Sequence, residues 1–185
     1  MRDQLLGAIQ PMLSILLDPG ESVIGEASRF AWMTDSIEMA VANETAVWVY
    51  TATGEPGTVA FAAQRPGRII CVEVGPRDEG YLFRRSDFMA RTPGVQVRAD
   101  PAEYGLGRWR IGGCGQAWVE LAGDVVRREL TAGQSLRARP EHVGMFNGSI
   151  AIQVTQVHGT PRYLCAVLSG PGVVWLQSMP SAAEQ

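Results

Sequence analysis

The sequence contains no lysine, only two histidines and only three cysteines among its 185 residues. All 16 basic residues are therefore arginine, and 19 acidic residues bring the formal net charge to −3. A chain with this balance has no overall positive field, which argues against DNA and against anionic membranes as partners. The exclusive use of arginine is typical of the coding bias of a GC-rich genome and carries no functional argument.

The cysteines Cys71, Cys114 and Cys165 are odd in number and far apart in the sequence. This spacing argues against a disulfide framework and against a Cys-x-x-Cys metal site. A reducing cytoplasm is the compartment that this cysteine usage favours.

Long apolar runs are also missing. The apolar stretch from Gln4 to Leu17 is interrupted by Gln10 and Pro11, is too short to span a bilayer, and lacks the basic start and small-residue cleavage site of a secretory signal. We therefore expect no transmembrane segment. Residues 1–16 are interpreted as an N-terminal arm and first strand, with Leu5 to Gln10 as a short helix or arm and Met12 to Leu17 as the strand.

A repeated pattern organises the rest of the chain. The segment that begins at Leu17 returns at Leu130 without a gap, and a degenerate copy begins at Val74. A glycine followed by an apolar triplet then occurs at nearly the same distance after each start, at Gly57, Gly115 and Gly172. Two landmarks with conserved spacing predict three tandem units, because repeat architectures show self-similarity at a fixed period. We assign the units to residues 17–73, 74–129 and 130–178 of a single domain, 17–178, with a tail at 179–185.

Each unit has the composition of β structure. Turn residues such as Asp18-Pro19-Gly20 and Asn147-Gly148 alternate with short stretches rich in β-branched and aromatic residues. The predicted strands include Thr45 to Ala52, Arg68 to Val74, Gln116 to Leu121, Val125 to Leu130 and Arg162 to Leu168. The apolar triplets predict strands that are covered on both faces. One unit buries too little surface alone, so we predict an all-β fold in which three units form a pseudo-threefold β-sandwich or barrel around a shared core.

The chain resembles the family named for altered inheritance of mitochondria, member twenty-four. The resemblance covers Met12 to Ser178 and rests on LDPGES (17–22), GTVAFAAQRPGRIICVEV (57–74), FMARTPGVQV (88–97), GQAWVELAGDVVRREL (115–130) and GPGVVWLQS (170–178). It implies a fold similar to that of the tryptophan-RNA-binding attenuator, with internal triplication and homo-oligomers that are often trimers. It also implies a connection with organisation of the mitochondrial inner membrane in eukaryotic members. Family members commonly carry long glycine-rich loops, which the short connection Ala40 to Glu44 lacks.

No group of residues predicts a catalytic, cofactor or metal site. His142 and His158 have no partners in a recognisable pattern, and the serines that recur with the units (Ser22, Ser36, Ser135 and Ser149) are better explained as turn hydrogen-bonders. Gly105-Leu-Gly107 and Gly112-Gly-Cys-Gly115 precede no helical pattern, so hairpin turns explain them better than a phosphate cradle.

Arginine and tryptophan supply the remaining candidates. The basic residues Arg84, Arg85, Arg127, Arg128, Arg137 and Arg139, together with Arg108-Trp109-Arg110, combine charge with a stacking surface, as single-stranded RNA binding requires. A solvated strand face is the favoured interpretation, because the net charge does not favour a polyanion. For Trp32, Trp48, Trp109, Trp118 and Trp175, core filling is favoured over a ligand cage, since Trp118 and Trp175 hold the same place in two units.

The favoured function is a non-enzymatic, homo-oligomeric scaffold or adaptor that holds an unidentified protein partner. The alternative is a binding module for a small ligand or single-stranded RNA. A third hypothesis, an enzyme of the cupin kind, needs several histidine and carboxylate ligands around a metal. The two distant histidines make that hypothesis the weakest of the three.

Overall fold

The computed structural model describes residues 1–42, 46–100, 108–156 and 164–180. The described chain consists of β-strands and three single-turn 3₁₀ helices, which confirms the predicted all-β class. Its contacts group it into two compact units: unit 1 (Met1–Val74, Phe88–Val95 and Cys114–Glu120) and unit 2 (Gly75–Asp87, Gln96–Gly113 and Leu121–Gln185). None of the described segments forms a helix with the length and apolar character that crossing a membrane requires.

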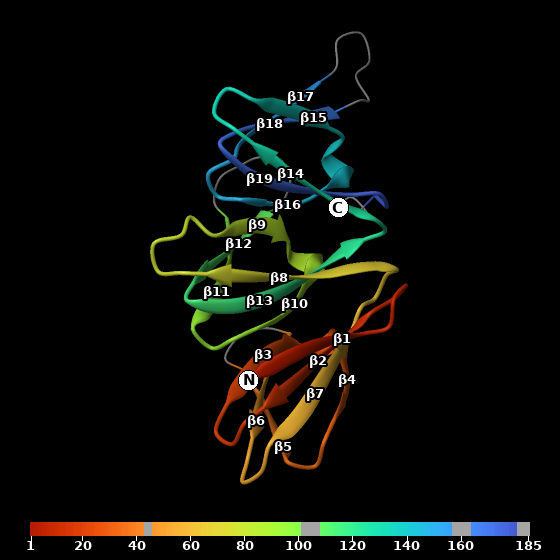
Figure 1. Cartoon of the computed structure of the whole chain (residues 1–185), viewed down its shortest axis with the longest axis vertical. Coiled ribbons are helices and arrows are strands. Elements are labelled where there is room, and N and C mark those ends of the chain that lie inside the picture. The colour runs from red at the N-terminus through yellow and green to blue at the C-terminus, as the bar shows by residue number, and fades with distance from the viewer. Residues whose placement is uncertain (43–45, 101–107, 157–163, 181–185) are drawn as a thin grey trace. The chain divides into compact units, whose positions relative to one another are not determined.

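Two sheets make up unit 1 (Figure 1). The four-stranded sheet has the order β1-β2-β7-β4 and the six-stranded sheet the order β5-β6-β3-β10-β13-β8. The strands are β1 (Arg2–Leu6), β2 (Met12–Leu17), β3 (Ser22–Glu26), β4 (Phe30–Met33), β5 (Ile37–Val41), β6 (Val47–Ala52), β7 (Gly57–Ala62), β8 (Gly67–Val74), β10 (Phe88–Arg91) and β13 (Gly115–Ala122).

Unit 2 also contains two sheets. The six-stranded sheet has the order β11-β12-β9-β16-β19-β14, and the three-stranded sheet has the order β15-β18-β17. The strands are β9 (Tyr81–Arg84), β11 (Val95–Ala99), β12 (Arg108–Gly113), β14 (Val125–Leu130), β15 (Ser135–Ala138), β16 (Val143–Asn147), β17 (Ala151–Gln156), β18 (Leu164–Ser169) and β19 (Gly172–Gln177).

The three 3₁₀ helices mark a common succession of elements. The helices η1 (Ala27–Arg29), η2 (Arg85–Asp87) and η3 (Pro140–His142) lead directly into β4, β10 and, in the third case, β16. Around them, β7 lies between β2 and β4, β13 lies between β8 and β10, and β19 lies between β14 and β16. The unit boundaries at 17–73, 74–129 and 130–178 and the shared threefold core stay predictions. The described sheets have open edges, so the barrel form of the predicted fold is not what these strands build.

Most predicted strands lie where the sequence placed them. Met12–Leu17 and Val125–Leu130 have the predicted limits, and the strands predicted at Arg68 and Gln116 are longer by one or two residues. The strands predicted from Thr45 and Arg162 begin at residues outside the described ranges and continue as β6 and β18. The predicted burial on both faces is confirmed for the triplets of β7 and β13, whereas the triplet of β19 is only partly buried.

Of the two alternatives for Leu5 to Gln10, a short helix or an arm, the helix is wrong. Arg2–Leu6 forms strand β1 and pairs antiparallel with β2, with Leu5 opposite Leu13 and Leu6 opposite Met12. Main-chain hydrogen bonding to the neighbouring strand decides this conformation, because a five-residue segment has too little local preference to form a helix in isolation.

Each unit has its own hydrophobic core between its two sheets. In unit 1 the alternating residues Leu13, Ile15 and Leu17 of β2 are fully buried against the six-stranded sheet. In unit 2 the core joins Val143, Phe146 and Val174 of the six-stranded sheet to Ile152, Ala166 and Leu168 of the three-stranded sheet. These alternating positions are the inward faces of half-buried strands, whose burial is the main stabilising contribution.

Tyr50 is a polar residue at the centre of the unit 1 core. Its ring is fully buried, is stacked on Phe30 at a centroid distance of 5.6 Å, and meets Phe61 edge-on at 5.3 Å. Its hydroxyl has no hydrogen-bond partner among the described residues. Burial raises the pKa of Tyr50 to about 12, because the phenolate would lose its hydration.

We predict that Tyr50→Phe raises the free energy of unfolding by about 1 kcal/mol near pH 8, since it removes an unsatisfied buried hydroxyl and keeps the ring contacts. Because the pKa of Tyr50 is about 10 in the unfolded chain and about 12 in the fold, the free energy of unfolding of the wild type is unaffected by this group below pH about 10. It falls as the pH rises from about 10 to about 12, since the phenol ionises more readily in the unfolded chain. The advantage of the variant therefore widens over that window. Urea unfolding of both proteins at increasing pH measures it, and a variant less stable than wild type at pH 8 contradicts the prediction.

Candidate functional site

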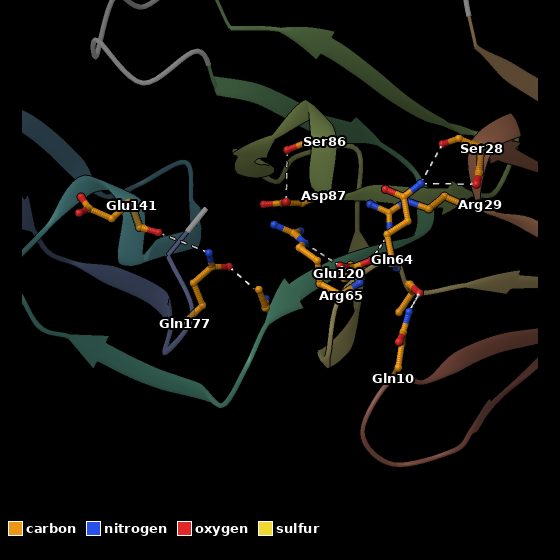
Figure 2. Close-up of polar contacts among 12 residues, drawn as sticks. Gln10, Ser28, Arg29, Gln64, Arg65, Ser86, Asp87, Glu120, Glu141 and Gln177 are labelled. Carbon is orange, nitrogen blue, oxygen red and sulfur yellow. Dashed lines mark hydrogen bonds and ion pairs between the residues drawn. The ribbon is translucent and has the colours of Figure 1, made fainter. Parts of the chain in front are cut away.

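His142 serves the main chain of unit 2. Its Nδ1 lies 2.9 Å from the carbonyl oxygen of Gln177, and the ring is half-buried at the end of η3. The Gln177 side chain is buried, accepts a hydrogen bond from the Ala122 N–H at 3.2 Å and donates to the Glu141 carbonyl at 3.4 Å (Figure 2). These contacts tie η3 to β19, so His142 is structural. His158 lies outside the described residues.

The recurring serines divide into two kinds. Ser36 donates to the Pro56 carbonyl and Ser149 accepts from Asn147, so both are hydrogen-bonded in turns as predicted. Ser22 and Ser135 instead lie on strands, where they exchange hydrogen bonds with the cross-strand hydroxyls of Thr51 and Ser169. The glycines at 105 and 107 lie outside the described residues. Gly113 and Gly115 have positive φ in the connection from β12 to β13. The predicted hairpin is wrong there, because these two strands belong to different sheets.

The Arg-Trp-Arg cluster of unit 2 does not form a free basic surface. The Arg108 side chain is 3% exposed, and its guanidinium donates to the carbonyls of Val143 at 2.7 Å and Gly144 at 2.8 Å. Arg110 donates to Asp100 at 2.7 Å and to the Glu79 carbonyl at 2.6 Å. The Arg108 guanidinium is therefore committed to the main chain of unit 2, whereas Arg110 is held by Asp100 with 38% of its side chain exposed.

The other arginines of the predicted basic stripe divide into Arg84 and Arg85, which are buried or partly buried, and four exposed residues. Arg84 is buried and donates to the Pro140 carbonyl at 2.8 Å, while Arg85 lies over the Trp109 ring at 5.4 Å. Arg127 is paired with Glu129 at 3.5 Å, and Arg139 is paired with Glu141. Only Arg128 and Arg137 of this set are exposed side chains for which no ion pair is described.

From this arrangement we predict no salt-dependent binding of single-stranded RNA. Fluorescence polarisation of a labelled oligouridine, titrated with the protein at about 20 mM salt, should stay flat, because phosphate binding needs free cationic groups and is strongest at low salt. A rise in polarisation at low salt that disappears near 200 mM salt would contradict this prediction.

A buried acidic residue of unit 1 was missed by the sequence reasoning. Glu120, on β13, is fully buried and paired with Arg29 of η1, which is itself 2% exposed. Its carboxylate also accepts from the main-chain N–H of Gln64 at 2.8 Å and of Arg65 at 3.1 Å, and from Arg65 Nε at 2.8 Å (Figure 2). One carboxylate thus joins η1 and the turn between β7 and β8 to β13. The sequence signal that could have identified Glu120 as a buried residue is that it is the one charged residue in the apolar run GQAWVELA.

We predict that Glu120→Gln lowers the free energy of unfolding by about 3 kcal/mol, because it removes the buried negative charge that Arg29 and the N–H groups of Gln64 and Arg65 share. Chemical denaturation measures the loss. Glu129→Gln is the matched control, since Glu129 is 70% exposed and its pair with Arg127 is open to solvent. Equal stability of the two variants would mean that the Glu120 cluster contributes nothing beyond an exposed pair.

The tryptophans differ in exposure. Trp118 is fully buried in the unit 1 core, with its Nε1 donating to Asp3 at 3.2 Å, which confirms the predicted core role for this residue. Trp48 packs against the same core, and Trp175 is half-buried against Tyr81. Trp32, on β4, is 40% exposed, so core filling was the wrong interpretation there.

Exposed apolar residues gather on strand edges of unit 1. Strand β4 ends the four-stranded sheet and carries Trp32, and β5 ends the six-stranded sheet and carries Met39 at 40% and Val41 at 77% exposure. Unpaired edges with apolar side chains are templates for pairing with another chain, which monomeric proteins usually block with charge, proline or a covering loop. These edges are the candidate interaction surface of unit 1.

The cysteines and acidic residues form no metal site in the described ranges. No three His, Cys, Asp or Glu side chains gather there in a way that would hold an ion. Cys71, Cys114 and Cys165 are free thiols. Cys71 is exposed as a residue, but loss of hydration around its thiol and, to a smaller extent, the charges of Asp3 and Glu73 raise its pKa to about 11.

A family model described as mitochondrial biogenesis AIM24 matches residues 4–179. The chain belongs to this family. The fold agrees with that of protein SPYM3_0169 from Streptococcus pyogenes, a crystal structure that is similar to this AIM24 family member with a TM-score of 0.79. The alignment covers 97% of this chain and 94% of the other at 17% sequence identity, so the likeness concerns the fold alone. No curated protein sequence matches the chain.

Proposed function

We propose that this AIM24 family member is a non-enzymatic, homo-oligomeric scaffold or adaptor of the cytoplasm. The observation that carries the proposal is the pair of open strand edges with exposed apolar residues, Trp32 on β4 and Met39 and Val41 on β5. Exposed edges of this kind favour association by strand addition, in which main-chain hydrogen bonds supply affinity and side-chain pockets supply specificity.

Two further features support a scaffold over a binding module for RNA or a small ligand. Three of the arginines that could meet a polyanion, Arg84, Arg108 and Arg110, are instead committed to carbonyl groups and a carboxylate of unit 2. The titratable residue His142 is likewise tied to a main-chain carbonyl. The free thiols are compatible with a reducing compartment.

The oligomer is the part of the proposal that a direct measurement tests first. In sedimentation velocity at protein concentrations from about 1 to about 100 µM, we expect species heavier than the 20.0 kDa chain, with trimers as the form that the family resemblance implies. A strict monomer over the whole range would remove the homo-oligomeric scaffold. The double variant Met39→Glu/Val41→Glu tests the β5 edge separately. If the variant protein keeps the mass of the wild-type oligomer, self-association uses another edge and β5 is left for a different partner.

A further inference from the structure

Each six-stranded sheet is composed of two sets of three strands. In unit 1 the set β5-β6-β3 continues into β10-β13-β8, and the strands that meet are β3 and β10. In unit 2 the set β11-β12-β9 continues into β16-β19-β14, and the strands that meet are β9 and β16. In both sheets, therefore, the strand that follows a 3₁₀ helix joins the strand that precedes a 3₁₀ helix in another part of the chain.

The two junctions have the same register. The three 3₁₀ helices begin at Ala27, Arg85 and Pro140. Equivalent residues six positions after these starts are Met33, Arg91 and Phe146, and equivalent residues three positions before them are Ile24, Leu82 and Arg137. Arg91 lies opposite Ile24 in unit 1, and Phe146 lies opposite Leu82 in unit 2. The geometry of the junction is thus the same in two places with different side chains, so it is set by the main chain.

The remaining two sheets each contain one unjoined set. Strand β4 follows η1 and ends the sheet β1-β2-β7-β4, whereas β15 precedes η3 and ends the sheet β15-β18-β17. In the described residues neither outer side is paired with a strand. In both six-stranded sheets a strand that follows a 3₁₀ helix, as β4 does, pairs with a strand that precedes one, as β15 does.

Burial shows what β4 lacks. All four residues of β10 are buried, as are the corresponding residues of β16, whereas Phe30–Met33 of β4 is only partly buried or exposed. Trp32 is 40% exposed, but the residues at its position in the joined strands, Ala90 and Met145, are fully buried. Ala90 belongs to the unit 1 core, to which strands of both sheets contribute, so this position is covered where the strand is joined.

The main-chain groups at both edges point outward in matching places. The Thr34 N–H donates to the Thr58 carbonyl, so by the alternation of an antiparallel ladder Met33 directs its N–H and C=O away from β7. The Gly170 N–H donates to the Gln134 carbonyl, so Arg137 likewise directs its groups away from β18. Met33 and Arg137 hold the two positions that lie opposite each other in both existing junctions.

We propose that β4 of one copy pairs antiparallel with β15 of a second copy, with Met33 opposite Arg137 and Trp32 opposite Ala138. The contact joins β2-β7-β4 of one copy to β15-β18-β17 of the other in the order of the two six-stranded sheets, with β1 as an additional edge strand. It also places Trp32 against Ala138 and Leu136, which are both partly exposed. It is heterologous: each copy uses β4 toward one neighbour and β15 toward another, which builds a ring or a filament. This inference rests on the proposed self-association and names its interface.

Two variants interrupt one edge each and leave the rest of the fold intact. Trp32→Glu places a charge at a contact that must be dry, and Arg137→Pro removes an N–H that faces the free edge while the ladder to β18 keeps its bonds. Their matched controls are Val41→Glu and Met39→Pro on the β5 edge, where exposure is similar or greater. Circular dichroism and thermal melting establish that all four variants fold.

Light scattering after size exclusion then tests the interface. We expect Trp32→Glu and Arg137→Pro each to reduce the mass to that of the 20.0 kDa monomer, and the β5 controls to keep the wild-type mass. An equimolar mixture of the two monomeric variants should form a dimer, because one copy retains β15 and the other retains β4. An oligomer that survives Trp32→Glu, or a mixture that stays monomeric, would overturn the proposed interface while self-association stands. A monomeric wild-type protein would overturn both.

Cross-linking gives the register independently of the mass. In a chain whose three cysteines are replaced by serine, Trp32→Cys with Ala138→Cys should form disulfides between chains, since directly opposite residues of antiparallel strands lie within disulfide distance. The off-register pair Trp32→Cys with Leu136→Cys should cross-link several-fold less. Equal cross-linking of the two pairs, or disulfides formed only within one chain, would contradict the proposed pairing.

Discussion

Main-chain pairing between strands that are distant in sequence is the interaction on which this fold depends. In unit 1, β10 adds to β3, and in unit 2, β16 adds to β9, each through antiparallel hydrogen bonds in one shared register. Without these junctions the sets of three strands would be small sheets with open edges, which bury too little apolar surface to be stable alone. The junctions make larger sheets, and the larger sheets provide the faces on which the cores form.

Buried guanidinium groups stabilise the segments beside these junctions. Arg29 meets Glu120 in unit 1, whereas Arg84 and Arg108 meet main-chain carbonyls at 140–144 in unit 2. In both units the bound segment is a 3₁₀ helix or the strand that it leads into. The contact described for Arg29 is an ion pair and those described for Arg84 and Arg108 are to carbonyl groups, and in each case a charged planar donor group binds the same kind of turn. Arginine's five donors suit this task better than lysine's point charge would.

This use of arginine shows that arginine pairs in a sequence do not by themselves define a nucleic-acid-binding surface. A residue such as Arg108 looks the same in sequence whether its guanidinium faces solvent or donates to Val143 and Gly144. The sequence context, an Arg-Trp-Arg cluster, predicted charge beside a stacking surface. Burial of Arg108 and the ion pair of Arg110 with Asp100 give this cluster a structural role in unit 2, and the apolar strand edges are the surface that we propose for association.

The sequence by itself determined the local features of this protein. Turn residues and β-branched runs placed strands such as Met12–Leu17 and Val125–Leu130, because these preferences act over a few neighbouring residues. The spacing of Gly57, Gly115 and Gly172 likewise placed three similar apolar strands, β7, β13 and β19. Only the tertiary structure decided that Arg2–Leu6 is a strand, that Glu120 is neutralised by Arg29 and that Trp32 is exposed. Each of these depends on a partner far away along the chain, and local preference carries no information about which distant segment comes to lie beside a residue.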